Sequence, residues 1–144
     1  MNENLRKVLE WAVWANLDEI ANSELLLLKG HLMLEVFMDS FLSTAESDSN
    51  KNASFYRKVE LISESIGGTE KGCHIVHLLS SLNKIRNKFA HEWRFSLSTS
   101  GIDMWADEVL ATFPVVKATK YTYRTKLVHA FAALARAVME CEKR

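Results

Sequence analysis

The feature that most constrains this chain is its shortage of turn-forming residues. Its 144 residues include one proline, Pro114, and only five glycines. A sandwich or barrel of many short strands needs a tight turn after each strand, and such turns depend on glycine and proline. The composition therefore favours long helices. With 48% hydrophobic residues, the chain can bury one core but is too short for two ordinary domains, so residues 1–144 are expected to form a single domain.

The spacing of the apolar residues predicts where the helices lie. Apolar side chains recur three or four positions apart, the helical period, in residues 5–20, 24–44, 55–66, 71–89 and 120–142. The segment 24–44 is apolar on nearly every side, which is typical of a central helix. Residues 45–54 read as a polar loop, and the weak pattern between 95 and 119 leaves room for a short helix at 103–112. The expected fold is all-α, an up-and-down bundle of four to five main helices.

Charge, cysteine content and hydropathy indicate the environment of the chain. Eighteen basic and eighteen acidic residues cancel, so any site for a polyanion must be local. Two cysteines without metal-ligand or disulfide spacing are typical of reduced thiols, and no signal peptide is predicted. The most apolar stretch, residues 25–42, contains Lys29, His31, Glu35 and Asp39. A bilayer span rarely tolerates four such groups, so a cytoplasmic protein without a membrane partner is expected.

One hexapeptide, Arg86-Asn87-Lys88-Phe89-Ala90-His91, stands out on the predicted helix 71–89. At about 100° per residue, one stripe roughly 140° wide beside the apolar face holds Asn83, Arg86, Asn87, Ala90, His91 and Arg94. Arg86 and His91 lie at opposite edges of this stripe, so one ideal helix does not direct both at one atom. Their convergence needs the reach of Arg86, a helix end near His91, or a second chain, and this favours a dimeric site.

Arginine and histidine together suit the cleavage of RNA. Arginine offers a permanently charged planar fork that matches a phosphate, and histidine holds or releases a proton near neutral pH. His91 would take the proton of a ribose 2′-OH or give one to the leaving oxygen, while Arg86 stabilises charge on the phosphorane. This chemistry needs no metal and no other cofactor. Lys84, Lys88 and Arg94, against one acid in the same segment, form a local basic patch for RNA.

Two acids on the predicted helix 24–44 are expected to support the site. Glu35 and Asp39 are four residues apart on an otherwise apolar helix, and an acid in such a place needs a partner to stay ionised. We expect one of them within ion-pair reach of Arg86. They would either orient Arg86 at the site or neutralise a buried charge.

Two other groups of residues resemble sites but have simpler explanations. Cys73, His74 and His77 are metal-ligand types, but no second pair completes a coordination shell, so no metal site is expected. Arg124 and His129 repeat the spacing of Arg86 and His91 and are expected on a solvated face. Spacing alone therefore does not identify a site.

The whole hexapeptide, preceded by Leu82-Asn83-Lys84-Ile85, resembles the motif of the HEPN family, in which a polar residue follows the arginine and a short spacer precedes the histidine. Many members are metal-independent ribonucleases, commonly toxins or defence effectors, built as helical bundles whose dimers join two motifs. The resemblance implies Arg86, Asn87 and His91 as catalytic residues. It also implies a homodimer, an RNA substrate and an antitoxin or other regulatory protein as partner.

The layout from the central helix through Ser54 to Trp93 also resembles the mannitol operon repressor family. This branch implies an alternative function, a non-catalytic HEPN domain that acts as a transcriptional regulator or a protein-interaction module. One position departs from the toxins. HEPN toxins silenced by nucleotidylation carry a tyrosine two residues after the histidine, whereas this chain has Trp93, which offers no hydroxyl to modify.

Overall fold

The computed structural model describes residues 3–43, 52–115 and 122–141 of the chain. These residues form six α-helices and no strand, which confirms the all-α fold class. The helices are α1 Glu3–Asp18, α2 Ser23–Ser43, α3 Phe55–Ile66, α4 Glu70–His91, α5 Ile102–Thr112 and α6 Tyr123–Glu140, with a short 3-10 helix at Leu97–Thr99. No helix among them is long and apolar enough to cross a membrane.

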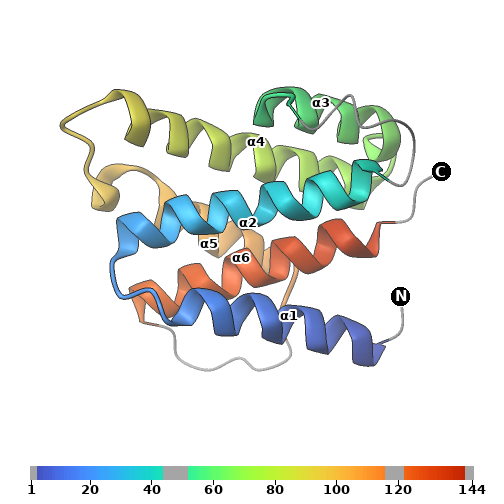
Figure 1. Cartoon of the computed structure of the whole chain (residues 1–144), viewed down its shortest axis with the longest axis horizontal. Helices are drawn as coiled ribbons and strands as arrows, with labels where there is room; N and C mark the ends of the chain where they lie inside the picture. Colours follow the sequence, from blue (N-terminus) through green and yellow to red (C-terminus); the bar gives the residue numbers. More distant parts are fainter. Residues whose placement is uncertain (1–2, 44–51, 116–121, 142–144) are drawn as a thin grey trace.

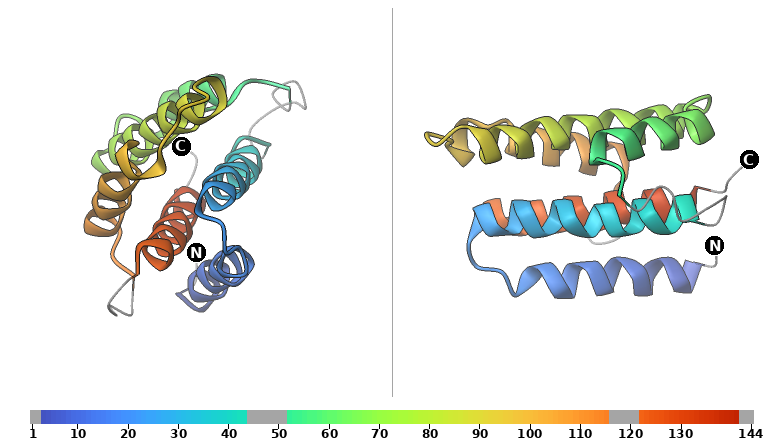
Figure 2. Two further views of the ribbon diagram at one scale, coloured as in Figure 1. Left: turned by 90° about the vertical axis from the view of Figure 1, so that its left-hand side faces the viewer. Right: turned by 45° about the horizontal axis from the view of Figure 1, so that its top comes forward.

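The helices lie in three layers. Figure 2 shows α3, α4 and α5 in the first layer, α2 and α6 in the second, and α1 in the third. Figure 1 shows that α1 and α2 run in opposite directions. The short helix expected at 103–112 is present as α5, because Ile102, Trp105, Ala106 and Val109 give it one buried face. The six helices thus exceed the expected four to five by this one element.

The segment 24–44 forms a central helix, α2, as expected, and α6 is a second central helix that the sequence pattern did not indicate. α6 contacts α1, α2, α4 and α5. α2 also contacts four helices, but it leaves Leu25, Leu32 and Val36 exposed. The sequence pattern concealed the position of α6 because five of its ten buried residues are alanines. Alanine is only weakly apolar, so it contributes little to the periodic pattern that predicts a buried face. Its small side chain nevertheless lets neighbouring helices approach α6 on several sides.

α2 and α6 are in tight contact at Gly30. A Cβ atom on Gly30 would lie 2.6 Å from two ring atoms of Phe131, a distance at which the ring or the helix must move. The absence of a side chain at this position therefore sets the separation of the two central helices.

Local contacts hold α4, the helix that carries the hexapeptide, at several points along its length. Its first turn is capped by Thr69, whose hydroxyl group accepts a hydrogen bond from the Gly72 amide. In the middle, the indole nitrogen of Trp105 donates to the Leu78 carbonyl oxygen at 2.9 Å. Beyond its end, Phe89 and Phe95 pack edge to face, with ring centroids 5.0 Å apart. These contacts fix the backbone on which the candidate site is built.

The boundaries of the last helix follow from its cap. The predicted helix 120–142 begins at Tyr123, because Thr122 and Thr125 form a capping box in which each side chain bonds the other's backbone amide. Most of the loop predicted at 45–54, together with residues 116–119 of the weak segment, lies outside the described residues.

Candidate functional site

Arg86 and Asn87 lie in a pocket between α2, α4 and the start of α3. The pocket has a volume of about 460 Å³. Its polar lining includes His31, Glu35, Tyr56, Asn83, Arg86 and Asn87. The apolar walls come from Leu28, Leu32 and Phe55. Three elements far apart in the sequence therefore place polar groups around Arg86.

His31 is the most deeply buried polar group of this pocket, with 5% of its surface exposed. Its Nε2 lies 3.2 Å from the Asn83 Oδ1, and its ring stacks on Phe55 with centroids 4.1 Å apart. Burial lowers the pKa of His31, an effect that the hydrogen bond with Asn83 opposes. His31 is thus a core residue that these two contacts hold in place. Its place beside Arg86 was missed, because nothing in the sequence says that α2 and α4 meet there.

Lowering the pH from about 7.5 to about 5.5 is expected to reduce the free energy of unfolding, with His31 as one cause. Because burial lowers the folded-state pKa of His31 below the ordinary value of 6.5, the unfolded chain binds a proton there that the folded chain does not. The stabilisation by neutral His31 is complete above pH 6.5 and is lost as the pH falls toward the folded-state pKa. Urea denaturation at the two pH values measures the difference.

The variant His31→Gln should show a smaller pH dependence than the wild type. It should keep a part of that dependence, because burial also lowers the pKa of His129. Equal pH dependence in the wild type and in His31→Gln would contradict the assignment to His31.

The two acids of α2 bind a lysine of α3, and not Arg86. The Nζ atom of Lys58 lies 2.8 Å from the Glu35 Oε1 and 2.9 Å from the Asp39 Oδ1, and Lys58 is only 1% exposed. Burial acts to lower the pKa of Lys58, but the hydrogen bonds with both carboxylates outweigh it, so that pKa is raised. The predicted ion pair with Arg86 is therefore wrong. The acids do neutralise a buried cation, but the sequence did not show that α3 supplies it.

Arg86 has no ion-pair partner among the described residues. It is half-buried, and its Nη1 donates a long hydrogen bond of 3.4 Å to the Asn87 Oδ1. Since the nearby acid Glu35 is engaged by Lys58, most donors of the Arg86 guanidinium are available to an anion.

The three cations predicted to bind RNA are all exposed. Lys84 and Lys88 lie on α4, and neither pairs with an acid in the described part of the chain. Arg94 follows the helix, and its guanidinium lies 4.6 Å from the ring centroid of Trp93, itself 87% exposed. Positive charge and an exposed aromatic ring thus meet at the end of α4, a combination that suits single-stranded nucleic acid.

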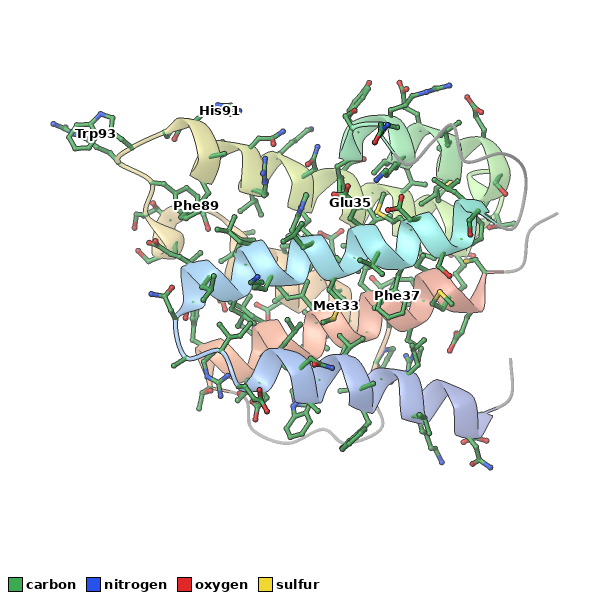
Figure 3. The ribbon with its side chains drawn as sticks, in the orientation of Figure 1. Met33, Glu35, Phe37, Phe89, His91 and Trp93 are labelled. Atoms are coloured by element: carbon green, nitrogen blue, oxygen red, sulfur yellow. The ribbon has the colours of Figure 1, made fainter. Side chains whose placement is uncertain are left out.

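His91 lies outside the pocket. It is the last residue of α4 and is exposed, and Figure 3 shows its side chain at the upper edge of the molecule, between Trp93 on the loop and Glu35 on α2. Arg86, in contrast, lines the pocket. Of the arginine and histidine pair, the pocket thus holds only the arginine.

The second arginine and histidine pair with this spacing has a structural role. Arg124 donates to the Asp18 carbonyl oxygen at 3.0 Å and to the Asp18 Oδ1 at 3.1 Å, so it binds the C-terminal end of α1, where a cation is favourable. His129 is half-buried, and its ring centroid lies 6.3 Å from that of Trp14. The expectation of a solvated face is wrong here, because the start of α6 packs against α1.

The candidate metal ligands are used in other contacts. The Cys73 thiol donates to the Gly67 carbonyl oxygen at 2.9 Å, and the His77 Nε2 lies 3.0 Å from the Glu108 Oε1. Within the described ranges, no three His, Cys, Asp or Glu side chains are grouped so that they could hold a metal ion.

Comparisons with protein-family models, with curated proteins and with solved structures found no match to this chain. The resemblance to the HEPN family therefore depends on the residues that carry it, from Leu82 to Trp93. What the chain does has to be argued from the geometry and chemistry of those residues.

Proposed function

We propose that this protein is a HEPN-type endoribonuclease that acts as a homodimer in the cytoplasm. The observation that carries the proposal is Arg86, half-buried and without an ion-pair partner among the described residues, on the same helix as the exposed His91. From Lys84 to Arg94 there are four cations against the single acid Glu92. A neutral protein with such a segment has a local binding site for a polyanion.

The reaction needs only groups that the motif provides. A neutral His91 accepts the proton of a ribose 2′-OH, and the 2′-oxygen attacks the adjacent phosphorus. Arg86 stabilises the negative charge of the phosphorane, and the 5′-oxygen leaves with a proton that the now protonated His91 returns through a water molecule. The products are a 2′,3′-cyclic phosphate and a 5′-OH. In a dimer, His91 of one copy acts with Arg86 of the other, and Asn87 beside Arg86 helps to hold the phosphate.

Cleavage of a labelled RNA in the presence of EDTA tests the proposal. We expect fragments that end in 2′,3′-cyclic phosphate, and no cleavage of an oligonucleotide that lacks 2′-hydroxyls. His91→Ala should lower the rate by about 10²- to 10⁴-fold, because it removes the group that transfers the proton. The matched control is His74→Ala, since His74 is exposed on the same helix near its other end. Intact RNA with the wild type, or equal cleavage by the wild type and His91→Ala, would overturn the proposal.

A second candidate is a non-catalytic HEPN domain that acts as a transcriptional regulator or as a protein-interaction module. The position of His91 outside the Arg86 pocket favours it, because the pocket holds only the arginine of the pair. Exposed Leu32 and Tyr56, which line that pocket, would add apolar contact area. Stable RNA in the assay above, together with DNA or protein binding that Arg86→Ala and His91→Ala leave intact, would support this candidate.

A further inference from the structure

We propose that the pocket between α2, α3 and α4 is a subsite for one nucleotide of the RNA chain, with the base inside the pocket and the adjoining phosphate on Arg86. The inference rests on the proposed function, since it names the part of the substrate that this site takes. It adds residues of α2 and α3, above all His31 and Tyr56, that the hexapeptide motif does not include.

The size and lining of the pocket suit a single nucleotide. Its volume of about 460 Å³ is within the usual range for small-molecule sites. Leu28, Leu32 and Phe55 provide apolar walls, and the other seven lining residues are polar, with Asn83 and His31 among them. Glu35, the one acid in the lining, is paired with Lys58. A nucleobase has the matching character, with two apolar faces and a polar edge.

His31 and Asn83 form a fixed hydrogen-bonding pair for the edge of the base. Because the Nε2 of His31 lies 3.2 Å from the Asn83 Oδ1, Nε2 carries the proton of the neutral ring and Nδ1 is left as an acceptor. Nδ1 has no hydrogen-bond partner among the described residues. The Asn83 amide keeps its N–H donors. The pair therefore offers a donor and an acceptor, the combination that the edges of bases recognise.

Tyr56 and Arg86 supply the remaining contacts. Tyr56 is 66% exposed at the first turn of α3 and lines the pocket, so its ring is available to stack on a base. Arg86 lines the same pocket, and its guanidinium is available to the phosphate that follows. A base that lies between Leu32 and Tyr56 would hold the RNA chain beside α4, the helix that carries Arg86 and His91.

Binding of mononucleotides to the full-length His91→Ala protein tests the subsite without interference from cleavage. The probes are AMP, CMP, GMP and UMP, with ribose 5-phosphate and inorganic phosphate as ligands that lack a base. Titration by calorimetry, with the Asn83 side-chain amide and residues 54–56 followed by NMR, gives affinity and location. We expect at least one nucleotide to bind about ten-fold or more tightly than ribose 5-phosphate, because base stacking and edge contacts add to the phosphate contact.

Two variants and one control locate the contact. Tyr56→Ala and Leu32→Ala, both at exposed positions on the rim of the pocket, should each weaken the best nucleotide by about five-fold or more. Leu25→Ala is the matched control, because Leu25 is an exposed leucine on the same helix that does not line the pocket. It should leave the affinity unchanged.

The outcomes separate the subsite from the ribonuclease. Equal affinity for nucleotides and for ribose 5-phosphate, or no shift of the Asn83 amide at saturation, would overturn the subsite even if the wild type cleaves RNA. Base-dependent binding that Tyr56→Ala weakens, together with RNA that stays intact, would support the nucleotide pocket and overturn the ribonuclease.

Discussion

An equal mixture of Arg86→Ala and His91→Ala chains is expected to recover about a quarter of the wild-type RNA cleavage, although each variant alone is inactive. In an isologous dimer each composite site takes the arginine of one copy and the histidine of the other. Random pairing makes about half of the dimers mixed, and in a mixed dimer one of the two sites contains both intact residues, so about a quarter of all sites are active. Cleavage of labelled RNA after joint refolding of the two variants measures the recovery.

This expectation comes from the placement of the two side chains. Arg86 lines the pocket between α2 and α4, and His91 is exposed at the end of α4. A twofold axis near the α4 helices would bring one copy's His91 toward the other's Arg86. A chain that carries both substitutions, mixed with either single variant, is the control, because no pairing of those chains yields a complete site. Activity in the control, no recovery in the mixture of single variants, or a monomer by light scattering at micromolar concentration would contradict the shared site.

The largest expected effect on stability is that of Lys58→Ala, which should lower the free energy of unfolding by about 3 kcal/mol. Lys58 is buried and bonds both Glu35 and Asp39, so its removal leaves two partly buried carboxylates without their cation and also opens a cavity. The estimate is at the low end of the range for broken buried pairs because both carboxylates keep some contact with water. Urea denaturation at neutral pH measures the change.

The neighbouring residue provides the control for this variant. Arg57 pairs with Glu60 at 3.1 Å, but both side chains are largely exposed, so Arg57→Ala should cost less than about 1 kcal/mol. Adding Glu35→Gln and Asp39→Asn to Lys58→Ala should recover part of the loss, because the uncompensated charges disappear. Equal losses in Lys58→Ala and Arg57→Ala would show that burial of the ion pair has no energetic importance.

The parts of the fold that could be predicted are those that depend on local sequence. α3 has the predicted bounds, because local groups set both ends: the Ser54 side chain accepts from the Arg57 amide at the start, and the Gly67 amide, in right-handed helical conformation, donates to the Ser63 carbonyl oxygen at the end. The central position of α6 could not be predicted, since it depends on buried alanines whose effect appears only when other helices approach.

The same distinction applies to the candidate site: features of one segment could be predicted, and contacts between helices could not. Helical angles along one segment predicted that Arg86 and His91 lie at opposite edges of a stripe, and in the structure Arg86 alone of the two lines the pocket. The partners of Glu35 and the position of His31 could not be predicted, because each depends on which helices meet in space. The motif identified the helix that carries the site, and packing decided which residues of α2 and α3 surround it.

The contact between Gly30 and Phe131 links the core to the pocket. Gly30 immediately precedes His31 on α2, so the backbone of both residues moves together if α2 is displaced from α6. A methyl carbon at position 30 would lie 2.6 Å from the Phe131 ring, so the ring or α2 has to move. A shift of α2 carries His31 with it, so a substitution in the core alters the pocket without touching a ligand.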